Sequence, residues 1–275
     1  MSDPVDYEVE YNNRARVPEN PALMAGWASD AAAYREQHSP RTMSYGSGAR
    51  NTIDLFAGNG DCPIVVFIHG GYWQALDGSF FSHCARGLNA HGITVAVPTY
   101  DLCPAVTVGE IVRQMQAAAR ELAKLGRPLV ISGHSAGGHL AACLLATDWR
   151  ALDASLPSDL ILAAYAISGL FDLVPLVGTS INNALRLDGE SARAASPLSW
   201  NAPSRGSLDA VVGEKESAEY FRQSHSVVER WGAAGVATHF GVVTGANHFT
   251  AIAPLADPGS AMVGRLRQLA RRQGP

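Results

Sequence analysis

The pentapeptide at 133–137 reads Gly-His-Ser-Ala-Gly and fits the pattern Gly-x-Ser-x-Gly, which is typical of a nucleophilic serine. The apolar run 128–132 before it suits a buried strand, and the Ala- and Leu-rich stretch 136–146 after it suits a helix. A sharp turn between a strand and a helix strains the serine backbone, so the flanking residues must be small. The pattern predicts that Ser135 is a nucleophile. Taken alone, it also fits a tight turn that contains a serine.

A serine nucleophile needs a base to accept its proton and an acid to hold that base in one tautomer. We expect His248 to be the base, because it follows the last apolar strand candidate and precedes the final helix candidate. Glu216 is the preferred acid, because it follows the penultimate strand and keeps the chain order serine, acid, histidine. The carboxylates that remain alternatives to Glu216 are Glu214, Glu219 and Asp172.

The third requirement is a set of donors for the oxyanion that forms during acyl transfer. Two adjacent glycines follow the apolar run 63–68, and adjacent glycines allow the backbone to lie flat beside a carbonyl group. We expect the oxyanion hole to consist of Gly70, Gly71, Tyr72 and Ala136. His69 is expected to anchor this loop through its ring.

Large apolar residues flank the catalytic segments and predict a substrate pocket for a small, largely uncharged aryl or short acyl group. The residues expected to bind substrate are Trp73, Leu170, Phe171 and Phe249. No cation lies within the serine, histidine or oxyanion motifs, so Arg186 or Arg193 would have to hold a substrate carboxylate.

Composition narrows the function classes. The chain has 275 residues, 47% of them apolar and 17% charged, which is typical of a compact enzyme. Its net charge of −4 offers no basic surface for nucleic acid, so a small-molecule partner is expected. Neither a His-Glu-x-x-His motif nor a Gly-x-Gly-x-x-Gly motif is present, and we expect no metal and no cofactor.

The cysteines and the hydropathy of the sequence indicate the cellular compartment in which the protein is expected. Four cysteines without a Cys-x-x-Cys spacing favour free thiols. The longest apolar run, 160–171, is shorter than the ~18 residues of a membrane span, and no leader pattern opens the sequence. We therefore expect a cytoplasmic protein that does not bind membranes.

Apolar runs and helical stripes alternate along the chain and predict one α/β domain. Residues 1–41 are expected to form a helical extension packed on the core and suited to a homodimer contact. Residues 42–275 are expected to form the domain, with a cap insertion at about 173–205. The expected strands are 42–45, 51–56, 63–68, 93–98, 128–132, 160–167, 207–212 and 237–243.

With these motifs in place, the chain resembles the α/β-hydrolase superfamily, and within it the hormone-sensitive-lipase-like and kynurenine-formamidase-like esterases. The segments that carry the resemblance are 69–74 (His-Gly-Gly-Tyr-Trp-Gln), 100–104 (Tyr-Asp-Leu-Cys-Pro), 133–137 and 247–249 (Asn-His-Phe). The resemblance implies a mostly parallel central sheet flanked by helices, with a small irregular cap. It also implies that Ser135 is the nucleophile and His248 the base. The family's acid is usually Asp, whereas Glu216 stands here.

Three functions are compatible with this pattern. The first is a serine hydrolase of small, largely apolar esters or aryl formamides that acts through an acyl-enzyme. The second is a general carboxylesterase without formamidase activity. The third is a non-catalytic ligand-binding protein on the same scaffold, although the intact Ser135 and His248 argue against it.

Overall fold

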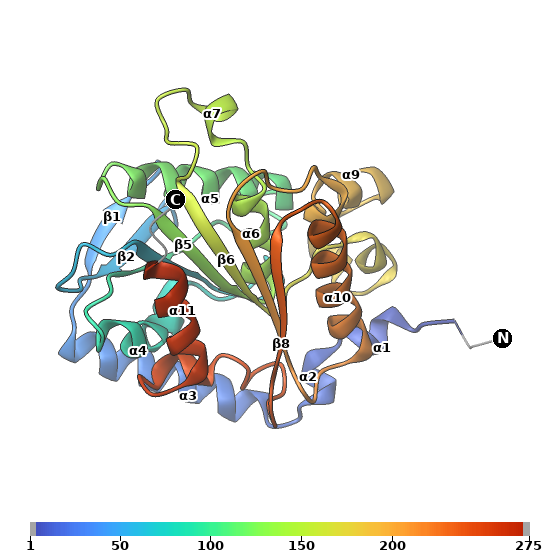
Figure 1. Ribbon diagram of the computed structural model, residues 1–275. Helices are drawn as coiled ribbons and strands as arrows, with labels where there is room; N and C mark the ends of the chain where they lie inside the picture. Colours follow the sequence, from blue (N-terminus) through green and yellow to red (C-terminus); the bar gives the residue numbers. More distant parts are fainter. Residues whose placement is uncertain (1–3, 272–275) are drawn as a thin grey trace.

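Eight strands form one central sheet in the computed structural model, which describes residues 4–271 (Figure 1). Their order across the sheet is β1-β2-β4-β3-β5-β6-β7-β8, and β2 alone runs antiparallel to the other seven. The expected mostly parallel α/β sheet is therefore confirmed. The strands are β1 (Arg41–Ser44), β2 (Thr52–Phe56), β3 (Ile64–Ile68), β4 (Val95–Pro98), β5 (Leu129–His134), β6 (Ile161–Ile167), β7 (Ser207–Gly213) and β8 (Ala237–Val243).

Burial explains the composition of the strands. Every residue of β3, β5 and β7 is buried, as expected for parallel strands covered by helices on both faces. By contrast, β8 lies at the edge of the sheet and is largely exposed. Ile68 at the end of β3 pairs with Gly133 near the end of β5. This register brings the loops that follow the two strands to the same edge of the sheet.

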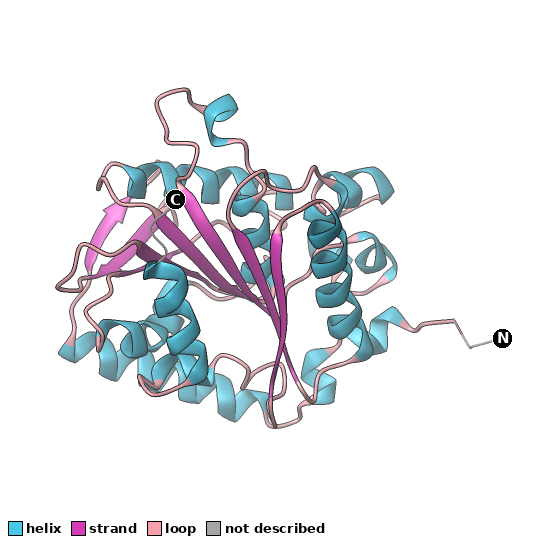
Figure 2. Cartoon of the chain, in the orientation of Figure 1, coloured by secondary structure: helices cyan, strands magenta, loops and turns pink. Residues whose placement is uncertain are grey.

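Helices cover both faces of the sheet (Figure 2). The core on one face contains buried residues of α5, α6 and α10, and the core on the other contains residues of α3, η1, α4 and α11. The helices are α1 (Tyr7–Tyr11), α2 (Asn13–Arg16), α3 (Asn20–Gln37), α4 (Arg86–Asn89), α5 (Val108–Ala123), α6 (Ala136–Leu145), α7 (Trp149–Leu152), α8 (Asn182–Leu185), α9 (Gly189–Ala194), α10 (Ala218–Ala233) and α11 (Ala261–Arg271). Short 3-10 helices are η1 (Gly78–Ala85), η2 (Val174–Gly178), η3 (Pro197–Ser199) and η4 (Ala253–Ala256).

The N-terminal helices α1, α2 and α3 run beneath the edge at which the parallel strands end (Figure 1). Helix α3 packs on η1, and α1 contacts both η2 and α10. Tyr11 anchors α1, because its ring is fully buried and its hydroxyl donates to Glu219 Oε2 at 2.8 Å. Tyr34 anchors α3, with its hydroxyl donating to Asn89 Oδ1 at 2.6 Å. The first helices are thus fixed against the sheet edge.

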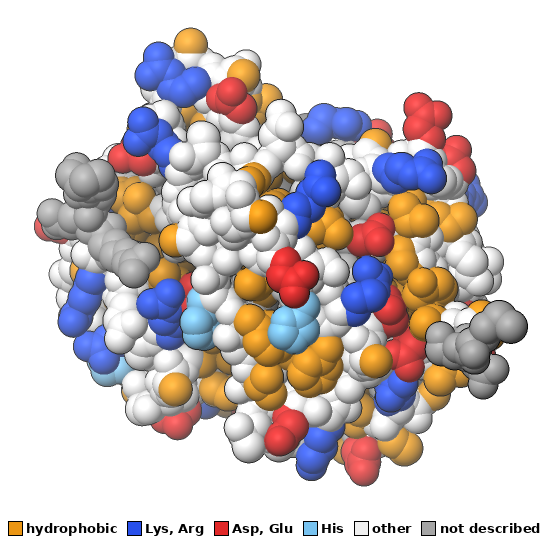
Figure 3. Space-filling view, turned by 45° about the vertical axis from the view of Figure 1, so that its right-hand side comes forward, with side chains coloured by type: hydrophobic (Ala, Val, Ile, Leu, Met, Phe, Trp, Pro, Cys, Tyr) orange, Lys and Arg blue, Asp and Glu red, His pale blue; other side chains and the backbone are white. Residues whose placement is uncertain are grey.

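The surface carries acidic and basic side chains that are mixed over the face shown in Figure 3, with apolar side chains gathered near its centre. Between residues 4 and 271, no helix combines the length and the apolar character that crossing a membrane requires.

Candidate active site

Ser135 lies at the turn between β5 and α6, with φ 55° and ψ −116°. This strained conformation is held by the Ser135 amide, which donates to Ile167 O at 2.8 Å. A Cβ atom on Gly137 would lie 1.9 Å from Ile68 O, so only glycine allows α6 to approach β3 this closely. The turn aims Ser135 into a cavity that His248 also lines.

His248 and Glu216 form a hydrogen-bonded pair beside this serine. The distance from His248 Nδ1 to Glu216 Oε2 is 2.7 Å. The other carboxylate oxygen, Oε1, accepts from Gly213 N at 2.7 Å and from Ser168 Oγ at 2.5 Å. Since a carboxylate only accepts, the proton of the imidazole lies on Nδ1 and Nε2 is left as a base. The arrangement can accept a proton from a hydroxyl group and stabilise the imidazolium that results.

The three rival carboxylates are engaged elsewhere. Glu214 is exposed and accepts from Gly245 N at 2.6 Å. Glu219 pairs with Arg222 at 2.8 Å, and Asp172 lies 3.9 Å from the same guanidinium. None of the three bonds to His248 within residues 4–271.

Two buried histidines position the neighbouring loops. His134 Nε2 donates to the backbone oxygen of His248 at 2.9 Å, and burial, with His248 nearby, lowers the pKa of His134 well below its ordinary value. His69 Nδ1 donates to Gly70 O at 2.7 Å, while its ring stacks on Tyr100 at 4.2 Å. Burial lowers the pKa of His69 to about 4, so it stays neutral at pH 7. The anchoring of the His248 loop by His134 was not foreseen in the sequence.

The expected oxyanion loop reaches the same cavity, which Gly70, Gly71 and Tyr72 all line. Gly71 and Tyr72 both have positive φ angles, 107° and 49°. Across the described part of the chain, the amides of Gly70, Gly71, Tyr72 and Ala136 donate to no protein acceptor. Ala136 is fully buried and does not itself line the cavity. The assignment of these four amides to an oxyanion hole stays a prediction.

Three of the four residues expected to bind substrate lie elsewhere. Trp73, Leu170 and Phe171 are each fully buried and do not line the cavity, whereas Phe249 does. Trp73 has φ 56°, and its ring packs edge-on against His139 at 4.9 Å. The positive φ angles at Tyr72 and Trp73 reverse the chain, so that Tyr72 faces the cavity and Trp73 the core.

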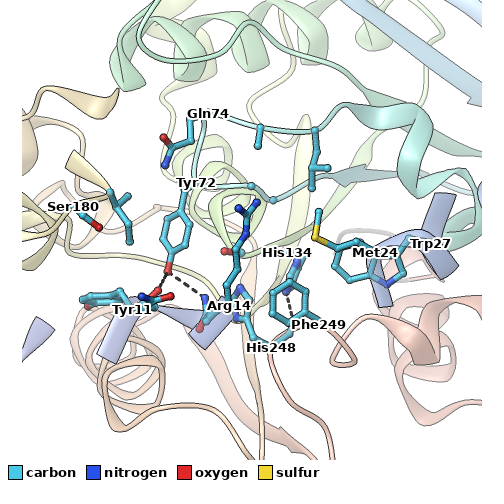
Figure 4. Close-up of a pocket in the computed structure, with 18 of the residues that line it drawn as sticks. Tyr11, Arg14, Met24, Trp27, Tyr72, Gln74, His134, Ser180, His248 and Phe249 are labelled. Carbon is cyan, nitrogen blue, oxygen red and sulfur yellow. Dashed lines mark hydrogen bonds between the residues drawn. The ribbon is translucent and has the colours of Figure 1, made fainter. Parts of the chain in front are cut away.

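The N-terminal segment supplies much of the wall of the cavity, which has a volume of about 480 Å³ (Figure 4). Neither Arg186 nor Arg193, the arginines that could have held a substrate carboxylate, lines it. Met24 and Trp27 of α3 also line this cavity, and Trp27 packs against the core at the same time. The N-terminal residues in the wall are Glu8, Tyr11, Asn12, Asn13, Arg14, Met24 and Trp27.

A buried hydroxyl network links this segment to the catalytic residues. Asn13 Nδ2 donates to Tyr220 Oη at 2.7 Å and to Tyr72 Oη at 3.1 Å, and the two hydroxyls lie 2.7 Å apart. The Tyr72 hydroxyl donates onward to Tyr11 O at 2.7 Å. Burial raises the pKa of Tyr72 and of Tyr220, which keeps both hydroxyls protonated. The Tyr220 ring lies 4.7 Å from that of His248, so the network abuts the expected base.

Comparisons with known proteins agree with this geometry. A family described as alpha/beta hydrolase fold matches residues 65–199. The kynurenine formamidase of Danio rerio is 31% identical over 227 residues, which cover 78% of this chain and 76% of that protein. The kynurenine formamidase of Drosophila melanogaster is 30% identical over 227 residues, which cover 76% of this chain and 74% of that protein. The crystal structure of a candidate thioesterase from Silicibacter sp. TM1040 is similar with a TM-score of 0.85 at 35% identity, covering 95% of this chain and 98% of that one.

Proposed function

The chain is a hydrolase that belongs to the α/β-hydrolase family, and we propose that it cleaves small, largely apolar esters or aryl formamides through an acyl-enzyme on Ser135. The observation that carries the proposal is the 2.7 Å contact between His248 Nδ1 and the buried carboxylate of Glu216, at a cavity lined by Ser135. This contact leaves Nε2 of His248 free to act as general base.

The reaction follows from these positions. His248 Nε2 takes the proton of the Ser135 hydroxyl as Oγ attacks the acyl carbon, and Glu216 stabilises the imidazolium. Amides among those of Gly70, Gly71, Tyr72 and Ala136 receive the negative oxygen. The imidazolium then protonates the leaving alcohol or aryl amine as its bond to the acyl carbon breaks. A water molecule, deprotonated by His248, hydrolyses the acyl-enzyme and regenerates Ser135.

The cavity wall favours an aryl or short acyl substrate. Met24, Trp27, Phe81 and Phe249 line it, and the Trp27 ring lies 5.3 Å from Phe81 and 5.9 Å from Phe249. Aromatic walls of this kind bind flat apolar groups. The relatives named kynurenine formamidase support an aryl formamide as one substrate class.

The test compares kcat/KM for N-formylkynurenine with kcat/KM for short 4-nitrophenyl esters and a short acyl thioester. Ser135→Ala is measured beside the wild type, with the exposed Ser199→Ala as matched control. Formamide turnover that exceeds ester turnover and is lost in Ser135→Ala would support the formamidase. Ester turnover alone, lost in the same variant, would make the protein a general carboxylesterase. Activity that survives in Ser135→Ala would overturn the mechanism.

A covalent probe separates these enzymes from a binding protein on the same scaffold. A fluorophosphonate should label the wild type at Ser135 and should not label Ser135→Ala. Absence of labelling in a folded wild type would favour the non-catalytic alternative.

A further inference from the structure

Arg14 of α2 lies in the wall of the catalytic cavity, and Figure 4 shows its side chain extending into the space between Tyr72 and His134. Its guanidinium group makes no hydrogen bond or ion pair with any described residue. Arg16, in the same helix, is engaged instead, with Nη2 donating to Glu10 Oε1 at 2.7 Å and Nε donating to Val9 O at 3.3 Å. The two arginines therefore differ sharply in their availability to a ligand.

The charges around the cavity leave Arg14 without a counterion. Arg14 is the single Lys or Arg among the described residues that line the cavity, and Glu8 is the single carboxylate. Both oxygens of Glu8 are already bound, by Ser180 N and by Ser180 Oγ, each at 2.6 Å. Outside the lining, Glu216 has a fully buried side chain that is bonded to His248, and Glu10 is paired with Arg16. An anion entering the cavity thus meets a guanidinium that no protein carboxylate neutralises.

The backbone of Arg14 is fixed on both sides. Asn13 before it is 5% exposed and bonds to the hydroxyls of Tyr72 and Tyr220. The carbonyl oxygen of Arg14 accepts from Asn20 Nδ2 at 3.1 Å. Arg14 itself is exposed at the wall of the cavity, so its side chain is open to a ligand while its backbone is fixed. A cation on a fixed backbone loses less freedom on binding than one on a loose surface loop.

We propose that Arg14 is a specificity-determining residue that binds a carboxylate on the substrate while Ser135 attacks the acyl group. The proposal rests on the proposed hydrolase function and adds to it the residue that selects substrates with a carboxylate outside the scissile bond. Guanidinium is suited to this role because its planar fork of donors matches the two oxygens of a carboxylate. The apolar wall then receives the aryl part, and Arg14 sets its orientation.

Equilibrium binding tests the proposal without any turnover. In a Ser135→Ala background, isothermal titration calorimetry compares 4-phenylbutyrate with its neutral counterpart 4-phenylbutanamide. The carboxylate should bind more tightly, and Arg14→Gln should weaken its binding by about tenfold or more while changing amide binding by less than about twofold. Arg14→Lys keeps the charge but loses the fork of donors. Its affinity for the carboxylate should lie between that of the parent and that of Arg14→Gln.

Arg16→Gln is the matched control, because it removes a cation from the same helix that does not line the cavity. Its preference for the carboxylate should equal that of the parent protein. Equal affinity for the two ligands in the parent, or equal losses in Arg14→Gln and Arg16→Gln, would overturn the proposal. The hydrolase function is judged separately, by wild-type hydrolysis of the neutral ester 4-nitrophenyl acetate, which needs no contact with Arg14.

Discussion

Glu216 Oε2 lies 2.7 Å from His248 Nδ1, and the two residues come from loops that follow neighbouring strands, β7 and β8. The other oxygen of Glu216 is held by Gly213 N and Ser168 Oγ. These two bonds orient the carboxylate so that Oε2 is presented to the imidazole. The contact with Oε2 fixes the tautomer of the imidazole and helps to orient its ring.

Glu216→Gln should lower kcat by about 10³- to 10⁴-fold, because an amide nitrogen facing Nδ1 would favour the wrong tautomer. Glu214→Gln is the control, since Glu214 is exposed in the same loop and bonds to Gly245 N instead. Steady-state kinetics on the best ester substrate measures both variants. Equal losses in the two, or no loss in Glu216→Gln, would show that Glu216 is not the acid.

Tyr220→Phe should lower the free energy of unfolding by about 1–2 kcal/mol, because it removes a buried partner of Asn13 and of the Tyr72 hydroxyl. It should also lower kcat, since the Tyr220 ring abuts His248 and its hydroxyl orders Tyr72. Urea unfolding and kinetics are compared with Tyr7→Phe, where the ring is exposed. If Tyr220→Phe matched Tyr7→Phe in both measurements, the hydroxyl network would contribute neither to stability nor to turnover.

Gly71→Val should reduce kcat by about 100-fold, with a smaller effect on KM, if this loop forms the oxyanion hole. Gly71 has φ 107°, and a Cβ atom there would lie 2.4 Å from Ala75 O, so the loop must shift. The control is Gly26→Ala, because nothing lies within 4 Å of a Cβ atom at Gly26. A normal kcat in a folded Gly71→Val protein would place the oxyanion hole elsewhere.

Acid should destabilise the fold through its buried histidines. Burial lowers the pKa of His69, His83 and His139 to about 4, whereas in the unfolded chain these rings titrate near about 6.5. Below pH 6.5 the unfolded chain takes up protons that the folded chain excludes. The contribution of these histidines to the free energy of unfolding is therefore at its maximum above pH 6.5. It falls as the pH is lowered to about 4, by up to about 1.4 kcal/mol per pH unit for each histidine.

Urea titrations at about pH 7.5, 6 and 5 measure this slope. His139→Gln should make it shallower, because one proton-excluding site is removed, whatever the variant's stability at neutral pH. The exposed His38→Gln should leave the slope unchanged. A stability that is flat between pH 7.5 and 5 would contradict the prediction.

The fold could be predicted from the sequence because most strands coincide with a local run of apolar residues. All eight expected strands occur within a few residues of their predicted bounds, since continuous apolar runs such as 64–68 report burial on both faces of a parallel sheet. The same local signals place Ser135, Glu216 and His248 at the ends of their strands, and the sheet brings them to one edge.

The parts of the site that escaped prediction depend on long-range packing or on backbone angles. Asn13 meets Tyr220 across 207 residues, and neither residue belongs to a motif. Trp73 stands two residues after the glycine pair and was expected at the pocket, but it has a positive φ angle and its ring is buried in the core. Arg14 lies in a short polar helix whose place under the sheet edge no periodicity reveals.

The reach of the N-terminal helices into the cavity affects how the molecule matures during synthesis. Residues 8–27 are made before residues 219–248, yet Asn13 bonds to Tyr220, Tyr11 bonds to Glu219, and His248 lines the same cavity. A growing chain that lacks these partners has an incomplete substrate wall and no base. The cavity is thus completed only after the chain has been made as far as His248, and the segment 8–27 must then meet residues 219–248 before the proposed reaction can occur.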